Sequence, residues 1–131
     1  MKKIGLLGCG AIGTQIALAI DSGKIPGVLT HVYDSSKEAS IILVQKLKNK
    51  PEIVENPHLL SSHPVDIIVE AASQEAVRNV AHSVLQNKRD LMIMSVGALL
   101  DESIYDILSD ACEHFHKTIY LPSGAIAGLD A

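Results

Sequence analysis

Three glycines near the start of the chain have a spacing that suits the binding of a diphosphate. Gly8, Gly10 and Gly13 lie in the segment GLLGCGAIG and match the pattern G-x-G-x-x-G. In such a loop the first glycine permits a tight turn, the second leaves room for a pyrophosphate, and the third lets a helix pack closely on a strand. The helix offers unpaired amides and the positive end of its dipole to the phosphates. The alternative is a simple tight bend, because glycine triplets also occur by chance.

Asp34 is the second residue that a dinucleotide site requires. It follows Gly13 by about 20 residues and ends the next apolar segment, as the pattern demands. A carboxylate there accepts hydrogen bonds from the adenosine ribose hydroxyls and repels a 2′-phosphate, which favours NAD over NADP. Lys37 is near enough in the sequence to soften that preference, so NADP stays possible. The alternative for Asp34 is a solvated turn residue.

Other residue types that could do chemistry give weaker signals. We expect Cys9, inside the glycine loop, to be a small filler rather than a nucleophile. Glu70 ends a buried segment, where an acid needs a partner, and we expect a backbone donor there rather than the ribose. The six histidines show no ligand spacing, and His114 and His116 would point apart on a helix. We therefore expect no metal site.

Apolar segments of strand and helix type alternate along the chain and would position these residues. Strands are expected over 3–7, 28–33, 65–73, 90–97 and 117–124, with a weak edge strand in EIVEN. The helices between them are expected to start at 11, after Ser35 or Ser36, after Ser73 and after Asp101, with the second running to about 49. In the last of them we expect a set of side chains to face inward: Ile104, Tyr105, Ile107, Leu108, Ala111, Cys112 and Phe115. This alternation predicts an α/β fold of the Rossmann type, a doubly wound parallel sheet with helices on both faces.

The carboxyl ends of the other strands should line the same crevice, because ligands of open parallel sheets bind there. Those ends read EAAS at 70–73, SVGA at 95–98 and PSGAIAG at 122–128. All are rich in small residues, which would let a flat nicotinamide ring approach the backbone. The alternative is ordinary strand-to-helix turns.

Composition bounds the class of protein. The 131 residues fit one domain, and 47% apolar with 20% charged residues is typical of a globular chain. A net charge of −4 with only two arginines argues against nucleic-acid binding. We read no secretion signal and no apolar run long enough to span a bilayer, and we expect two reduced cysteines in a cytoplasmic protein.

Five segments together resemble the L-aspartate dehydrogenase family: GLLGCGAIG, VYDSS, VEAAS, MSVGAL and LPSGAIAGLDA. The likeness covers the whole chain but only the N-terminal half of a family member. It implies NAD(P)-dependent oxidation of L-aspartate to iminoaspartate, which hydrolyses to oxaloacetate and ammonia or feeds nicotinamide cofactor synthesis. The resemblance implies these cofactor contacts: Gly8, Gly10, Ala11, Ile12, Gly13, Asp34, Ala71, Ala72, Ser95, Val96 and Gly97, with Ala125 and Ala127 near the nicotinamide.

The resemblance also implies a second, α/β domain that carries a catalytic histidine and dimer contacts. We therefore expect residues 1–131 to form the dinucleotide-binding domain, a substrate domain normally to follow, and the full-length protein to be a homodimer. Arg78 and Arg89 are expected to lie far from the strand carboxyl ends, so we see no clamp for a dicarboxylic substrate and assign no catalytic residue. The alternatives are another Rossmann oxidoreductase, such as a homoserine or sugar dehydrogenase, and a non-catalytic NAD(H)-binding module.

Overall fold

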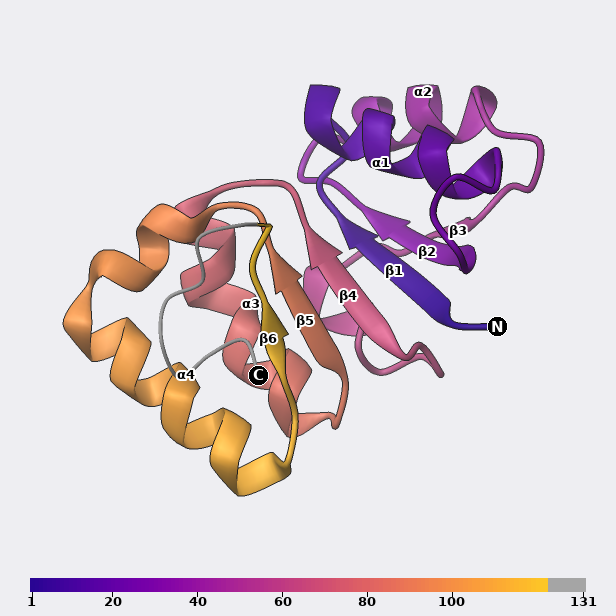
Figure 1. Ribbon diagram of the computed structural model, residues 1–131. Coiled ribbons are helices and arrows are strands. Elements are labelled where there is room, and N and C mark those ends of the chain that lie inside the picture. Colours follow the sequence, from indigo (N-terminus) through magenta and orange to yellow (C-terminus); the bar gives the residue numbers. More distant parts are fainter. Residues whose placement is uncertain (123–131) are drawn as a thin grey trace.

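A single six-stranded parallel sheet organises the chain, and the computed structural model describes it over residues 1–122 (Figure 1). The strands are β1 (Lys3–Leu7), β2 (Val28–Tyr33), β3 (Glu52–Ile53), β4 (Ile67–Glu70), β5 (Asp90–Ile93) and β6 (Ile119–Tyr120). The helices are α1 (Ala11–Asp21), α2 (Lys37–Gln45), α3 (Gln74–Gln86) and α4 (Glu102–Phe115), with the short 3₁₀ helices η1 (Pro57–Leu59) and η2 (Val96–Leu100).

The strand order is β3-β2-β1-β4-β5-β6, and every neighbouring pair is parallel. This order confirms the predicted Rossmann-type doubly wound sheet, and the weak strand β3 lies at an edge as expected. Strands β1, β2 and β3 are added toward one edge of the sheet, and β4, β5 and β6 toward the other, so the strand order reverses between β1 and β4. A ligand crevice is expected at that switch point, outside the carboxyl ends of the strands.

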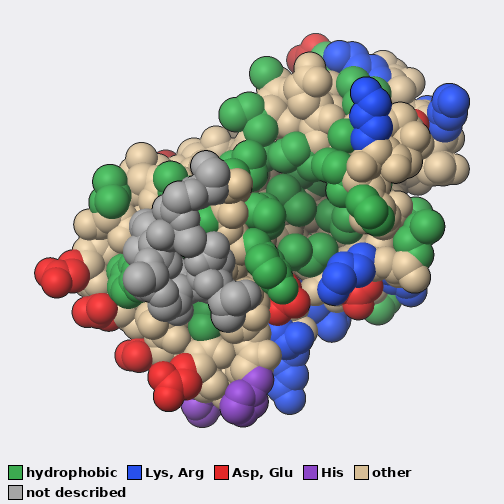
Figure 2. Space-filling view, viewed as in Figure 1, with side chains coloured by type: hydrophobic (Ala, Val, Ile, Leu, Met, Phe, Trp, Pro, Cys, Tyr) green, Lys and Arg blue, Asp and Glu red, His purple; other side chains and the backbone are tan. Residues whose placement is uncertain are grey.

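Two aliphatic cores lie on opposite faces of the sheet. One cluster joins α1 and α2 to β1 and β2, around Leu6, Val32 and Leu43. The other packs α3 and α4 against β4, β5 and β6, around Ile68 and Leu85. Figure 2 shows hydrophobic side chains gathered over the middle of the sheet on the side seen in Figure 1. Within residues 1–122, no helix combines the length and apolar character that crossing a membrane requires.

Several predicted boundaries were wrong. The second helix ends at Gln45 rather than near residue 49. The strand expected over 90–97 stops at Ile93, because the Ser95 amide bonds to the Glu70 carboxylate and the chain turns into η2. Ile107 is 52% exposed rather than inward-facing, whereas its neighbour Leu108, one helical step around α4, is buried.

Candidate functional site

Two of the three loop glycines are required by the chain's own backbone. Gly8 has a φ of +109°, and a Cβ there would lie 2.5 Å from the carbonyl oxygen of Ala71. A Cβ at Gly13 would collide with the carbonyl oxygen of Gly8, so α1 could not approach the loop. The Gly8 amide donates to the carbonyl of Tyr33 at 2.8 Å. These contacts bring the ends of β1, β2 and β4 together.

Gly10 differs from both, because nothing in the described chain requires a glycine there. Its φ of −79° suits any residue, and within residues 1–122 no atom apart from its neighbours in the sequence lies within 4 Å of where its Cβ would be. The space beside Gly10 is therefore open. A pyrophosphate lying against the backbone would need that space, which gives the absence of a side chain a reason that the folded chain alone does not supply.

The first turn of α1 leaves its amides to a ligand. Gly10 provides no capping side chain, and no acidic residue lies in the first turn. The helical ladder begins with the Thr14 amide donating to the Gly10 carbonyl at 2.8 Å. The amides of Ala11 and Ile12 precede that bond and have no intrahelical acceptor. The Ile12 side chain is 56% exposed, and its predicted cofactor contact stays a prediction.

Asp34 connects the end of β2 to the glycine loop. Its carboxylate accepts the Cys9 amide at 2.7 Å through Oδ2 and the Ser36 amide at 2.8 Å through Oδ1. Each carboxylate oxygen has a second lone pair, so both can still accept a hydroxyl. Lys37 lies on the next turn and pairs with Glu55 at 3.2 Å, with both side chains largely exposed.

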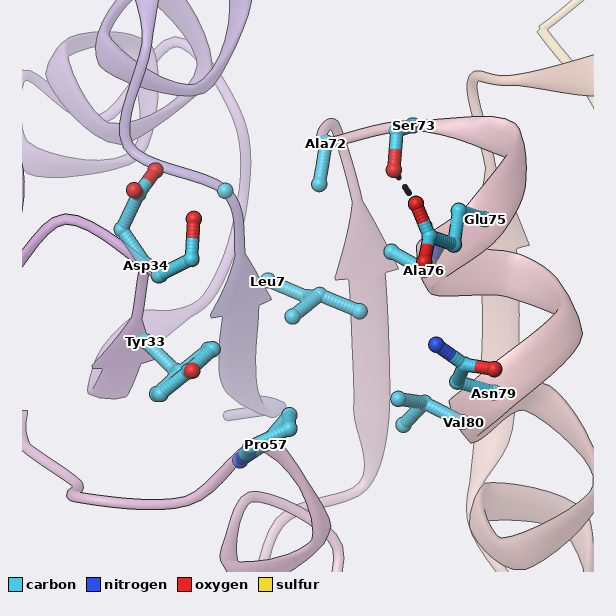
Figure 3. Close-up of a pocket in the computed structure, with 12 residues that line it drawn as sticks. Leu7, Tyr33, Asp34, Pro57, Ala72, Ser73, Glu75, Ala76, Asn79 and Val80 are labelled. Atoms are coloured by element: carbon cyan, nitrogen blue, oxygen red, sulfur yellow. Dashed lines mark hydrogen bonds between the residues drawn. The ribbon is translucent and has the colours of Figure 1, made fainter.

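A pocket of about 300 Å³ opens beside Asp34 (Figure 3). Its walls come from the ends of β1 and β2, from the start of η1, and from the β4–α3 loop with the first two turns of α3. The sequence predicted Gly8, Asp34 and Ala72 as cofactor contacts and Ser73 as part of the crevice-lining loop 70–73. It did not predict the remaining residues that line the pocket: Leu7, Tyr33, Ser35, Pro57, Glu75, Ala76, Asn79 and Val80. For Leu7, Tyr33 and Ser35 the only sequence signal was a position close to the carboxyl end of a strand.

Glu70 fixes the neighbouring loops from inside the protein. It is 1% exposed, and its carboxylate accepts the amides of Ala72 at 2.7 Å, Met94 at 3.1 Å and Ser95 at 2.9 Å. The Ser95 hydroxyl donates to it as well, at 2.7 Å. The expectation that Glu70 meets backbone donors is confirmed. Its role is to hold the ends of β4 and β5 in register beside the pocket.

The remaining predicted contacts divide between two loops. Ala71 and Ala72 follow β4, and the Ala71 amide donates to the Leu7 carbonyl at 2.8 Å, so this loop lies against the glycine loop. Ser95, Val96 and Gly97 follow β5 at the same edge of the sheet, where a Cβ on Gly97 would collide with the Gln74 side chain. Ala125 and Ala127 lie outside the described residues, and their predicted contacts stay predictions.

The cysteine, arginine and histidine side chains considered in the sequence supply no reactive group to this pocket in the described chain. Burial, with a smaller contribution from the charge of Asp34, raises the pKa of the Cys9 thiol to about 12, so Cys9 stays a neutral filler. Arg89 donates to the carbonyls of Ser61 and His63, away from the pocket, as expected. No histidine is among the residues that line the pocket in the described chain.

The chain is similar in sequence to L-aspartate dehydrogenases. It is 79% identical over 130 residues to the L-aspartate dehydrogenase of Nitrosopumilus maritimus and 45% identical over 131 residues to that of Methanococcoides burtonii. Each match covers 99% of this chain and 48% of the relative. The chain thus spans about half the length of the curated relatives it matches.

Solved dehydrogenases share the fold. A myo-inositol dehydrogenase from Lactobacillus casei, in complex with NAD(H) and myo-inositol, has a TM-score of 0.85 at 15% identity, over 93% of this chain and 36% of that one. The family model described as "Homoserine dehydrogenase, NAD binding domain" matches residues 8–122, which include the glycine loop, Asp34 and the ends of β4 and β5. The chain therefore belongs to this family of NAD-binding domains.

Proposed function

We propose that this chain is the NAD-binding domain of an L-aspartate dehydrogenase. The open space at Gly10, beside an α1 terminus without a capping side chain, is the observation that carries the binding function. The reaction rests on the two L-aspartate dehydrogenases at 79% and 45% identity. Structural likeness at 15% identity does not bear on the substrate.

The described residues fit an extended dinucleotide across the sheet edge. The pyrophosphate would lie against Gly10 and the amides of Ala11 and Ile12, where the helix dipole favours negative charge. The adenosine ribose would bond to Asp34, with the adenine side in the 300 Å³ pocket. The nicotinamide half would extend past Ala71 toward the loop at 95–97, and we place Ala125 and Ala127 near it.

When bound, the nicotinamide ring supplies the acceptor for a hydride from the α-carbon of L-aspartate. The product is iminoaspartate, and a proton leaves the amine. The described loops that we place beside the nicotinamide, residues 71–72 and 95–97, contain no histidine and no arginine, so we propose that they bind and orient the cofactor. We assign the acid-base group and the carboxylate clamp to the other half of the full-length protein, which we propose to be a cytoplasmic homodimer.

The binding function can be tested by titrating the protein with NADH and NADPH and following nicotinamide fluorescence. Because Asp34 would repel a 2′-phosphate, we expect NADH to bind at least about tenfold more tightly than NADPH. Asp34→Asn removes the charge and keeps one of the two acceptor oxygens that bond the Cys9 and Ser36 amides, so the preference should shrink. Lys37→Gln is the matched control, because it removes a nearby exposed positive charge where Asp34→Asn removes a negative one. Absence of binding to either nucleotide would contradict the proposal.

The substrate is tested separately on the full-length protein. L-aspartate with NAD should yield NADH, whereas homoserine and myo-inositol should not. Activity with homoserine or a sugar alone would favour the other oxidoreductases. Nucleotide binding without turnover of any of them would favour a non-catalytic NAD(H)-binding module.

A further inference from the structure

His31, Glu52 and His63 meet on the outer strands of the sheet, apart from the residues that line the nucleotide pocket. His31 lies in β2, and Glu52 is its register partner in the edge strand β3. His63 comes from the segment between η1 and β4. One potential ligand atom of each residue lies within 4.8 Å of the other two, and within residues 1–122 no other trio of His, Cys, Asp or Glu is so arranged.

A hydroxyl orients the His31 ring. Its Nδ1 lies 2.8 Å from the Thr30 hydroxyl oxygen, which is also 3.4 Å from the Ile4 carbonyl oxygen. In the tautomer with the proton on Nδ1, the Thr30 oxygen accepts Nδ1–H, the hydroxyl donates to Ile4, and Nε2 carries a lone pair. Metal-binding histidines are oriented by this kind of bond from the other ring nitrogen.

The position of His63 is also fixed by its neighbours. Arg89 donates to the His63 carbonyl at 2.9 Å and to the Ser61 carbonyl at 3.2 Å, which anchors the backbone of this irregular segment. The His63 ring stacks on that of His31, with centroids 4.1 Å apart and planes at 16°. Its Nε2 lies 3.9 Å from Oε2 of Glu52. The His31 ring and the His63 backbone are thus positioned by residues outside the trio, whereas the Glu52 side chain is not.

We propose that His31, Glu52 and His63 bind a divalent transition-metal ion, with Zn²⁺ as the ion that suits the ligand set best. Two histidines and a glutamate, with water in the fourth position, form a known zinc ligand set. Tetrahedral Zn²⁺ with bonds of about 2.1 Å places ligand atoms about 3.4 Å apart. When the ion binds, the distances between the three ligand atoms would therefore shorten by roughly 1 Å, and the two stacked imidazole rings would tilt relative to each other. The Glu52 side chain, 64% exposed, is free to make most of that movement.

A bound ion would clamp the least regular part of the fold. The edge strand β3 has two residues, and the segment from β3 to β4 contains only the short helix η1. The ion would link β2, β3 and this segment, which also supplies Pro57 to the pocket wall. The site departs from the sequence expectation of no metal. Residues 31, 52 and 63 have no ligand spacing, and only the strand pairing brings them together.

Calorimetric titration of the metal-free protein with ZnCl₂ tests the proposal. We expect one site, saturable at micromolar Zn²⁺, and a higher unfolding temperature in its presence. Glu52→Gln and His63→Gln should each weaken binding by at least about tenfold. His114→Gln, which removes an exposed histidine of α4, is the matched control and should bind as the unaltered protein does. Circular dichroism verifies that each variant is folded.

Three results would overturn the site. They are no saturable binding up to millimolar Zn²⁺, binding by Glu52→Gln or His63→Gln as tight as that of the unaltered protein, or a thiolate charge-transfer band on Co²⁺ substitution, which would indicate a cysteine ligand. The NADH titration is read separately, so failure of the metal site leaves the nucleotide proposal standing.

Discussion

The β1–α1 and β4–α3 loops lie side by side at the same edge of the sheet, yet their helices begin in opposite ways. The Ser73 hydroxyl caps α3 by accepting the Ala76 amide at 3.0 Å, and Glu75 places a negative charge in the first turn. Helix α1 begins at Gly10 with neither a capping side chain nor an acid. One N-terminus is satisfied by its own chain, whereas the other leaves its positive end to an anion.

The other two α-helices in residues 1–122 begin as α3 does. Ser36 caps α2 by accepting the Ala39 amide, and Asp101 caps α4 by accepting the Ser103 and Ile104 amides. Each also has a glutamate in its first turn. A capping side chain is worth about 1 kcal/mol over alanine, so leaving α1 without one costs little stability in exchange for an open anion site.

The largest expected effect separates the two kinds of glycine within the β1–α1 loop. Gly13→Ala would drive a Cβ into the Gly8 carbonyl, and we expect the free energy of unfolding to fall by about 3 kcal/mol. Gly10→Ala meets no protein atom and should cost less than about 1 kcal/mol, the loss of a tolerated N-cap residue. Urea unfolding of both variants measures the difference. Equal losses would mean that Gly10 is also a packing glycine.

The next largest effect is expected from a substitution that gives the N-terminus of α1 a capping side chain, as α3 has. Gly10→Asp should change the unfolding free energy by only about 0.5 kcal/mol, because aspartate and glycine are both accepted at N-caps. Its charge would occupy the place of the pyrophosphate, so NADH binding should weaken at least about 100-fold, or about 2.7 kcal/mol.

Gly10→Asn is the matched control for that variant, since it has nearly the same shape without the charge. We expect it to lose much less affinity for NADH than Gly10→Asp does. Equal losses would attribute the effect to bulk alone, and no loss in either variant would mean that the pyrophosphate does not lie at Gly10.

The sequence predicted the features that depend on local spacing. The glycine loop, the position of Asp34 after the second strand, the Ser73 and Asp101 caps and the parallel sheet all follow from short-range patterns joined by the rules of parallel sheets. Glu70 was assigned correctly because a buried carboxylate needs donors wherever it lies.

What it did not predict depends on contacts between distant segments. Pro57 reaches the pocket wall because the segment after β3 folds over the sheet, and no local pattern signals that path. The strand after residue 89 ends early because the Glu70 carboxylate, 25 residues from Ser95, accepts the amide of that serine. Exposure of Ile107 depends on which of two adjacent helix positions meets α3, which periodicity alone leaves open.

The two loops also differ in the group buried at their base. The β4–α3 loop is held by the carboxylate of Glu70, whereas Cys9 in the β1–α1 loop is a thiol whose pKa rises from 9.0 to about 12 through burial and the charge of Asp34. Between pH 9 and 12 the unfolded chain releases this proton and the folded protein keeps it. Stability contributed below pH 9 is therefore lost as pH rises above 9, by up to about 1.4 kcal/mol per unit.

Unfolding measured at pH 8 and pH 10 checks this difference. Burial raises the pKa of Cys112 as well, so Cys112→Ala should serve as the common background. In that background, adding Cys9→Ala should reduce the loss of stability between the two pH values. An unchanged loss would show that the Cys9 thiol does not titrate differently in the folded and unfolded chains.

The smallest effect concerns the capped loop. Ser73→Ala removes the acceptor of the Ala76 amide and should lower the free energy of unfolding by about 1 kcal/mol. Ser73 lines the pocket, but its hydroxyl is already committed to α3, so NADH affinity should change by less than about threefold. Ser36→Ala, which uncaps α2 instead, is the matched control for stability. A large loss of NADH affinity in Ser73→Ala alone would mean that the β4–α3 loop also binds the nucleotide through its cap, and that the contrast between the two helix termini is one of degree.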